Sequence, residues 1–288
     1  MGNVSLHPKH QKRHYNVHMD QATDNLTLES AYTLANGKTI PALGLGVWKM
    51  AEGNETEQAV TWALEAGYRH IDTARLYANE RSVGSVVRRF MADSGVRRED
   101  IFVTTKLWPS DYFNPMAGFS ESIEKLDIDY IDLYLVHWPI PMMPKNIWQT
   151  FEKVYEQGLA KSIGVSNYSE SDIEKVLGYA NVAPMVNQVE FNPADYDLAL
   201  LEYCKAKDIV VEAYSPLGQG GLVKNKTVVG VAEKYKKSPA QILIRWALQH
   251  GTVVIPKSSN KERIKENTEV FDFHISESDM QILNGLGK

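Results

Sequence analysis

Eight short apolar runs alternate with segments of helical period from residue 32 onward, and this alternation limits the possible folds most strongly. The runs lie at residues 42–48, 69–74, 101–108, 131–139, 160–167, 185–192, 209–217 and 252–259. Their nearly continuous Val, Ile and Leu content is typical of parallel strands covered on both faces, because a half-exposed strand would alternate apolar with polar residues. The alternation therefore predicts an α/β fold built on a parallel sheet.

The segments between the runs carry helix signals. Val83 and Val87 recur at helical spacing behind Asn79, which is a candidate N-cap. Further along, Ser238 precedes Pro239, which is the favoured order of a cap and a first helical residue. We expect amphipathic helices whose apolar faces cover the sheet.

Eight strand–helix units in about 250 residues predict a (β/α)8 TIM barrel that forms one domain over residues 31–288. Before the first run, Asn36 and Gly37 predict a tight hairpin, and we expect it to close the bottom of the barrel. A doubly wound sheet is the alternative. That fold normally carries a glycine-rich dinucleotide fingerprint after its first strand, and "GLGVWK" lacks the third glycine.

Residues 1–30 lack the apolar period of the remaining chain, so we expect a disordered N-terminal extension. The net charge of −5 gives no electrostatic footprint for nucleic acid, and no apolar run approaches the roughly 20 residues that span a membrane. The single cysteine, Cys204, excludes an internal disulfide and is expected to be a structural thiol. We predict a cytoplasmic monomer that binds neither nucleic acid nor membrane.

Polar and aromatic residues gather where the runs end. A strand-end aspartate can simply cap a loop, but eight runs that all end in such residues indicate an active site at the carboxyl ends of the barrel strands. These residues are Trp48, Asp72, Lys106, Trp108, His137, Trp138, Ser166, Asn167, Gln188, Tyr214, Ser215, Lys257 and Ser258.

Four of the polar side chains suit proton transfer. The phenol of Tyr77, on the loop after Asp72, has an ordinary pKa of about 10, which is too high for an efficient acid near neutral pH. A buried Lys106 beside that phenol would lower its pKa by about 1–3 units, and Asp72 would keep Lys106 charged. His137 could donate a hydrogen bond to a carbonyl oxygen. No side chain can supply a hydride, so reduction would need a cofactor.

The segment "IPKSSNKERIKEN" offers a candidate phosphate site. Lys257 and Ser258 stand at a strand end, and Arg263 and Asn267 follow on one face of the helix that begins there. An ordinary solvated basic helix is the alternative. Tyr214 could stack on a cofactor ring, or it could simply be buried.

Several motifs in order make the sequence recognisable. They are "GYRHIDTA" with Tyr77 after it, "TTKLW", "LVHWP", "IGVSN", "VNQVE", "AYSPLG" and "IPKS". On these motifs the chain resembles the aldo-keto reductase family from about residue 32 to residue 286. It resembles most the short microbial and protozoan members, among them small-aldehyde and diketo-acid reductases and prostaglandin F synthases.

The resemblance implies NADPH-dependent reduction of aldehydes or ketones, with Tyr77 as the general acid, Asp72 and Lys106 tuning it, and His137 orienting the carbonyl. For the nicotinamide end of the cofactor, the resemblance implies that the carboxamide is held by Ser166, Asn167 and Gln188 and that Tyr214 stacks on the ring. For the rest of the cofactor, it implies that the pyrophosphate is approached by Ser215 and Leu217, the adenosine 2′-phosphate is bound by Lys257, Ser258 and Arg263, and the adenine lies near Glu266 and Asn267. It also implies that the substrate pocket is lined by Trp48, Trp108 and Trp138.

Two features depart from the family pattern. The chain ends at Lys288, whereas many relatives continue with a tail that lines the substrate pocket, so we expect a more open pocket. Arg75 stands where relatives often carry a small or apolar residue. It could face solvent, or it could contact an anionic substrate.

Two other functions were weighed. An NADPH-binding regulatory or structural protein on the same scaffold would show little turnover, and the retained Asp72, Tyr77, Lys106 and His137 argue against it. A metal-dependent barrel hydrolase would need further carboxylates or histidines at the strand ends to complete a ligand set, and the sequence does not offer them there. We therefore expect no metal.

Overall fold

The strands of the predicted barrel form one parallel sheet. The computed structural model describes residues 25–139 and 145–287. Its strands are β3 Leu45–Gly46, β4 His70–Asp72, β5 Phe102–Leu107, β6 Ile131–Val136, β7 Ala160–Ser166, β8 Val186–Glu190, β9 Val210–Tyr214 and β10 Val253–Val254, and they neighbour one another in chain order. Each pairs in parallel with the next.

The two ends of this sheet meet. Leu43, just before β3, forms a parallel bridge to Val254 of β10. The Gly44 N–H donates to the Val254 carbonyl at 2.9 Å, and the Val254 N–H donates to the Ala42 carbonyl at 2.9 Å. The sheet is therefore closed into a barrel, which confirms the predicted (β/α)8 fold and rules out the open doubly wound alternative.

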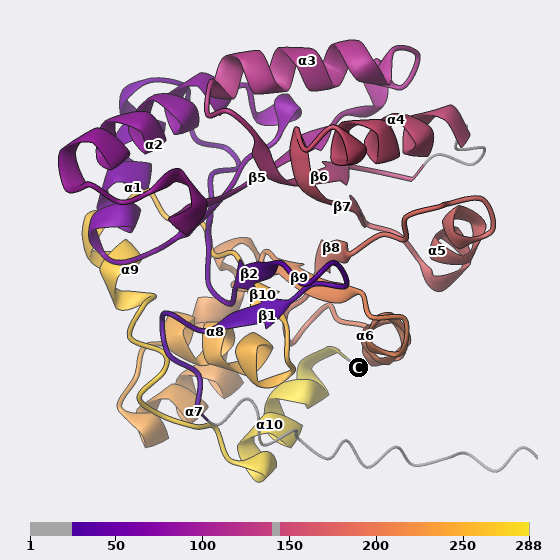
Figure 1. The fold of residues 1–288 in the computed structure, drawn as a ribbon. Helices are drawn as coiled ribbons and strands as arrows, with labels where there is room; N and C mark the ends of the chain where they lie inside the picture. The colour runs from indigo at the N-terminus through magenta and orange to yellow at the C-terminus, as the bar shows by residue number, and fades with distance from the viewer. Residues whose placement is uncertain (1–24, 140–144, 288) are drawn as a thin grey trace, which may run out of the picture.

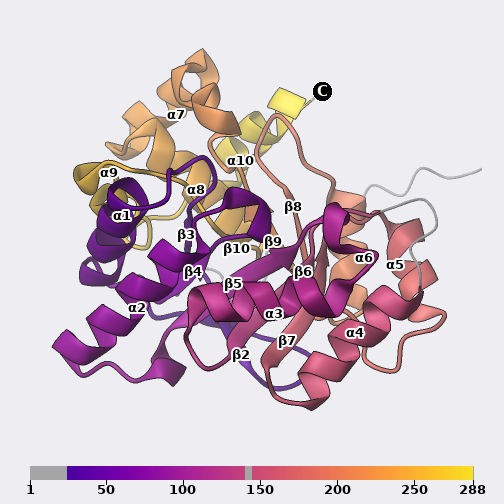
Figure 2. The ribbon, with the colours of Figure 1, turned by 90° about the horizontal axis from the view of Figure 1, so that it is seen from above.

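Helices surround the ring of strands (Figures 1 and 2). They are α1 Asn54–Glu65, α2 Glu80–Ser94, α3 Pro115–Leu126, α4 Lys145–Glu156, α5 Glu170–Leu177, α6 Leu198–Ala206, α7 Lys226–Tyr235, α8 Pro239–Gln249, α9 Lys261–Glu266 and α10 Glu277–Asn284. One helix follows each strand from β3 to β8, two follow β9, and two follow β10. The apolar helix faces and the strands form one continuous core.

The predicted helix caps had different outcomes. At α8 the prediction is confirmed, because the Ser238 side chain accepts from the Gln241 N–H and the Gln241 side chain accepts from the Ser238 N–H. At α2 the prediction that Asn79 caps the helix is wrong for its side chain. Asn79 occupies the N-cap position, but its amide is committed to the chain before the helix, where it donates to the Val47 carbonyl at 3.0 Å.

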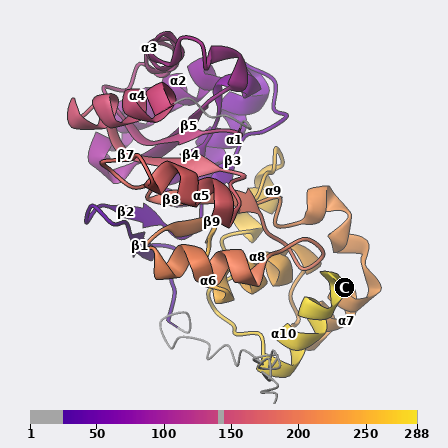
Figure 3. The ribbon, with the colours of Figure 1, turned by 90° about the vertical axis from the view of Figure 1, so that its right-hand side faces the viewer.

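The predicted hairpin is present and lies across one end of the barrel (Figures 1 and 3). Its strands are β1 Ala31–Thr33 and β2 Thr39–Pro41, and Gly37 in the connecting loop adopts φ 78°. The Asn36 side chain donates to the carbonyl of Lys161 at 2.9 Å, at the start of β7. The hairpin therefore covers the end where the parallel strands begin, and it leaves the carboxyl ends of the strands, where the site is predicted, free of the hairpin.

The described part of the expected extension, residues 25–30, lies against the barrel. The Ser30 carbonyl accepts from the Ala42 N–H at 2.9 Å, and Leu28 packs beside Gly67. Residues 1–24 lie outside the described residues, so the expected disorder and the boundary at residue 30 stay predictions.

Cys204 behaves as the structural thiol predicted from the sequence. It is fully buried in α6, and the Asn187 side chain lies 3.9 Å from its sulfur. Burial raises the pKa of the Cys204 thiol to about 11, so the unreactive protonated form persists at neutral pH.

Candidate active site

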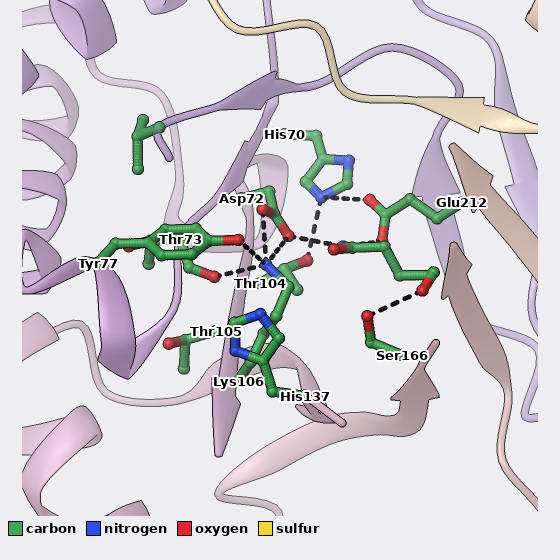
Figure 4. A network of polar contacts seen from close by, with 12 residues as sticks. His70, Asp72, Thr73, Tyr77, Thr104, Thr105, Lys106, His137, Ser166 and Glu212 are labelled. Atoms are coloured by element: carbon green, nitrogen blue, oxygen red, sulfur yellow. Dashed lines mark hydrogen bonds and ion pairs between the residues drawn. The ribbon is translucent and has the colours of Figure 1, made fainter. Parts of the chain in front are cut away.

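The carboxyl ends of β4 and β5 bring three of the predicted residues together (Figure 4). Lys106 Nζ donates to both carboxylate oxygens of Asp72, at 2.7 and 2.8 Å, and to the Thr73 carbonyl at 2.9 Å. The Tyr77 hydroxyl lies 3.4 Å from the same Nζ. Lys106 and Asp72 are almost fully buried, so a desolvated charge pair lies directly beneath a phenol.

Burial and charge act in opposite directions on this group. Burial raises the pKa of Asp72, while the Lys106 charge opposes that rise. Burial, the largest single effect, would lower the pKa of Lys106, but the Asp72 charge and hydrogen bond, together with the charges of Tyr77 and Glu212, outweigh it and the pKa is raised. Lys106 is therefore charged at neutral pH.

The predicted lowering of the Tyr77 pKa is wrong in its net direction. Burial raises the pKa of Tyr77 more than the Lys106 charge lowers it. The phenol is consequently protonated at neutral pH, which is the state that a proton donor requires, and Lys106 reduces the cost of forming the phenolate.

His137 follows β6 and lies beside the phenol. Its ring meets those of Tyr77 and Trp108 edge to face, with centroids 5.8 and 4.9 Å apart. Burial and then the Lys106 charge lower the pKa of His137 to about 3, so the imidazole is neutral. Within the described part of the chain its buried Nδ1 has no hydrogen-bond partner. A buried, unpaired polar atom at this position suits the binding of a polar ligand.

The Tyr77 loop is fixed from below. Arg75–Tyr77 form one 3-10 turn, which ends at Ala78 with φ 55°. The Thr73 hydroxyl donates to Asn79 Oδ1 at 2.7 Å, and Asn79 also ties the loop to the segment after β3. The phenol is therefore carried on a short segment anchored at both ends.

Arg75 is committed to two acids and so does not simply face solvent, while its contact with an anionic substrate stays a prediction. Its guanidinium pairs with Asp111 and with Glu121, both at 2.5 Å, and its side chain is 21% exposed. Asp111 belongs to the 3-10 turn Pro109–Asp111 after β5, and Glu121 belongs to α3. Arg75 thus ties the Tyr77 loop to the next strand–helix unit.

The residues predicted to hold a carboxamide lie together at the ends of β7, β8 and β9. Tyr214 donates to Asn167 Oδ1 at 2.8 Å, Asn167 Nδ2 donates to Ser166 Oγ at 3.0 Å, and Ser166 donates to the Gln188 carbonyl at 2.8 Å. Asn167 and Ser215 follow β7 and β9 directly and adopt φ 63° and 49°. Left-handed backbone at such positions often accompanies ligand binding.

The predicted phosphate-binding residues lie after β10. Lys257 and Arg263 are exposed, and neither side chain forms an ion pair or hydrogen bond with the residues that the structure describes. Helix α9 has six residues and is capped by Asn260, so any phosphate site there depends mainly on side chains. The other predicted cofactor residues range from buried to half-buried: Ser258, Asn267, Leu217 and Glu266.

The three predicted pocket tryptophans differ in exposure. Trp48 and Trp138 are 38% and 43% exposed. Trp108 is half-buried against His137. All three lie one or two residues after a strand, at the same end of the barrel as Tyr77.

Two buried residues of the site were not predicted from the sequence. Glu212 accepts from Gln188 Nε2 at 2.8 Å, and its other oxygen lies 3.4 Å from His70 Nε2. Both Glu212 and His70 lie inside an apolar run rather than at its end. A period-2 argument could have found them, because His70 shares a strand face with Asp72, and an isolated acid in a buried strand is itself unusual.

The described residues contain no group of three or more His, Cys, Asp and Glu side chains arranged to hold a metal ion. Among them there is also no helix whose length and apolar character would let it cross a membrane.

The family profile and the most similar sequences that we compared indicate the same protein family. The sequence profile of the Aldo/keto reductase family matches residues 42–288. A 9,11-endoperoxide prostaglandin H2 reductase of Trypanosoma cruzi is 47% identical, covering 89% of this chain and 91% of that protein. A glyoxal reductase of Bacillus subtilis is 45% identical over 91% of this chain and 94% of its own length.

Solved structures give the same answer. The crystal structure of an aldo/keto reductase from Brucella melitensis superposes with a TM-score of 0.82 at 43% identity, covering 89% of this chain and 99% of that one. The closed barrel, with the polar residues at one end of it, agrees with the family that the sequence and structure comparisons indicate. This chain belongs to the aldo/keto reductase family.

Proposed function

We propose that this protein is an NADPH-dependent reductase of aldehyde and ketone carbonyls in which Tyr77 donates the proton. The observation that carries the proposal is the 3.4 Å approach of the Tyr77 hydroxyl to Lys106 Nζ, above the buried ion pair with Asp72. The family and the reductase relatives support the same reaction class.

His137, Tyr77 and Lys106 have different roles at the carbonyl oxygen. Neutral His137 donates a hydrogen bond that orients the oxygen toward Tyr77. Tyr77 transfers its phenolic proton to the oxygen as the carbonyl carbon is reduced, and Lys106 stabilises the phenolate that remains. Bound NADPH supplies the hydride, so that the products are the alcohol and NADP+.

The chain has side chains that fit this cofactor. Exposed Lys257 and Arg263 without described partners provide charges for a phosphate, and Ser258 lies between them along the chain. At the other end of the site, Tyr214 offers an aromatic face near the ends of β7 and β8, held by Asn167. These residues would hold the adenosine 2′-phosphate and the nicotinamide respectively.

The pocket composition favours apolar or aromatic carbonyl compounds. Trp48, Trp108 and Trp138 would supply aromatic walls beside the polar pair of Tyr77 and His137. The relatives reduce glyoxal and prostaglandin H2, according to their names, so a prostaglandin F synthase-like activity is part of the proposal. A cytoplasmic location and a monomeric state stay predictions.

A substrate screen tests the proposal. Purified protein is mixed with NADPH and with aldehydes, quinones, keto-acids and prostaglandin H2, and NADPH consumption is followed. We expect turnover of several carbonyl compounds that persists with a metal chelator. No consumption with any of these compounds would contradict the function, and loss of activity with the chelator would favour a metal-dependent reaction.

A further inference from the structure

Two buried carboxyl groups share one amide nitrogen inside the barrel. Gln188 Nε2 donates to Asp72 Oδ2 and to Glu212 Oε2, both at 2.8 Å. An amide nitrogen has two N–H groups, so both are committed. If the amide were flipped, the Gln188 oxygen would face two acid groups, so the flipped orientation is disfavoured. With both N–H groups committed, Oε1 is the polar atom of this side chain that is left for another partner.

Glu212 is enclosed by a small set of groups. The titratable ones are His70 and Asp72 on β4 and Lys106 on β5, while β8 contributes Gln188. On the other side, β10 contributes only apolar Val253 opposite Glu212. Figure 4 shows Glu212 and His70 facing one another beside Asp72.

One cation faces two carboxyl groups in this cluster, so one of them must stay neutral. Burial and the Asp72 charge raise the pKa of Glu212 to about 8. Burial and the Lys106 charge lower the pKa of His70 to about 3, so this imidazole is neutral. At neutral pH Lys106 therefore remains paired with Asp72, and the neutral Glu212 carboxyl lies 3.4 Å from His70 Nε2, which also contacts the Thr104 hydroxyl at 3.0 Å.

Ionisation of Glu212 would change the chemistry at the site. Its negative charge raises the pKa of both Tyr77 and Lys106. A higher Tyr77 pKa makes the phenol a weaker acid and so disfavours transfer of its proton.

We propose that Glu212 is a positioning residue for the carbonyl reduction inferred above. Its carboxyl group holds the Gln188 amide so that Oε1 is left to accept a hydrogen bond from the cofactor carboxamide. Its neutral form also leaves the Lys106 charge to Asp72 and Tyr77. The proposal rests on the proposed function, because it needs a nicotinamide cofactor and an acidic Tyr77.

Two substitutions separate these roles. In Glu212→Gln the new amide oxygen can accept from Gln188, as the carboxyl does, but the side chain cannot ionise. In Glu212→Leu no acceptor remains for Gln188. We expect Glu212→Leu to weaken NADPH binding about tenfold, as for a buried donor left unpaired, and Glu212→Gln to restore the affinity.

The pH profile gives the second readout. We expect kcat of the wild type to fall as pH rises through about 8, the pKa of Glu212, and we expect this inflection to be absent from Glu212→Gln. Glu80→Gln is the control, because Glu80 is another buried carboxyl with a raised pKa that bonds Thr105 instead. It should keep the wild-type inflection.

Stability provides a readout without substrate. The pKa of Glu212 is higher in the folded protein than its ordinary value, so the folded state binds more protons between about pH 4.5 and 8. The Glu212 contribution to the free energy of unfolding therefore decreases as pH rises through this window. The melting temperature of Glu212→Gln relative to wild type should increase across it.

The outcomes are distinct. An inflection near pH 8 that persists in Glu212→Gln, or NADPH affinity unchanged in a folded Glu212→Leu protein, would overturn the role of Glu212 while leaving the proposed function in place. A wild type that reduces no carbonyl compound would overturn the proposed function itself, and the positioning role with it.

Discussion

At the scale of single residues, the site depends on one buried ion pair beneath one phenol. Lys106 is fully buried and donates to Asp72 and to the Thr73 carbonyl, so its position is fixed by three hydrogen bonds. That position sets its distance from Tyr77. In the proposed mechanism the same pair contributes to stability and to catalysis, and substitutions can separate the two.

Lys106→Met is expected to reduce kcat about 10²–10³-fold, because the charge that stabilises the phenolate of Tyr77 is lost. It should also destabilise the protein by about 3–5 kcal/mol, since Asp72 is left buried and unpaired. Thermal melting and NADPH consumption measure the two effects.

The double variant Asp72→Asn with Lys106→Met is the matched control. We expect it to recover much of the lost stability, because neither charge remains buried alone, but to recover no activity. Recovery of turnover in the double variant would contradict a direct role for the Lys106 charge.

The residues at the ends of the apolar runs were predicted from the sequence, whereas His70 and Glu212, which lie inside such runs, were missed. Asp72, Lys106 and His137 each end an apolar run, and the barrel brings those ends together. Glu212 stands in mid-strand, where the apolar pattern conceals it. The net direction of the Tyr77 pKa also required the structure, because the effect of burial depends on everything that surrounds the phenol.

At the scale of elements, the Tyr77 loop is held by contacts between neighbouring strand–helix units. Asn79 anchors one end of it to the chain after β3, and Arg75 pairs with acids after β5 and on α3. Trp108 lies just before the Pro109–Asp111 turn that carries one of those acids. The loop with the proton donor and the loop with a pocket tryptophan are thus linked.

Arg75→Met is expected to lower kcat roughly two- to tenfold, because small displacements of a catalytic group reduce turnover. Hydrogen exchange of the backbone at residues 74–79 should increase. Arg97→Met is the control, since Arg97 also pairs with two acids, Glu99 and Asp100, but on an exposed turn. Equal effects of the two substitutions on kcat would contradict the idea that the Arg75 ion pairs hold the Tyr77 loop in place.

Element boundaries were less predictable than the order of elements. The apolar run at 252–259 predicts a longer strand, but β10 is only Val253–Val254. Pro256 cannot donate a backbone hydrogen bond, so the ladder stops before it, and only its carbonyl accepts, from Gly46 N–H at 3.1 Å. Lys257 and Ser258 therefore lie in a loop.

At the scale of the whole molecule, barrel closure gathers residues from all eight strand–helix units around one opening. The hairpin covers the opposite end, so both the chemical groups and the expected cofactor contacts share one face. Tyr77 comes from the first half of the chain, and Lys257 and Arg263 come from its last units. On the proposed function, we expect substitutions at Lys257 and Arg263 to change cofactor selectivity without altering the proposed proton donor.

NADPH is expected to bind more tightly than NADH, because Lys257 and Arg263 are uncommitted cations where a 2′-phosphate would lie. Replacing both by Ala should weaken NADPH binding and leave NADH binding nearly unchanged. Fluorescence titration measures both affinities, with Lys153→Ala on the exposed side of α4 as control. Equal affinities of the wild-type protein for the two cofactors would refute this assignment.

The central claim is that the Tyr77 hydroxyl donates the proton, and Tyr77→Phe removes that hydroxyl alone. The measurement is kcat for NADPH-dependent reduction of a carbonyl substrate, with NADPH affinity determined on the same protein. We predict a fall in kcat of about 10²–10⁴-fold at nearly unchanged NADPH affinity. A Tyr77→Phe protein that keeps most of the wild-type turnover would contradict the account.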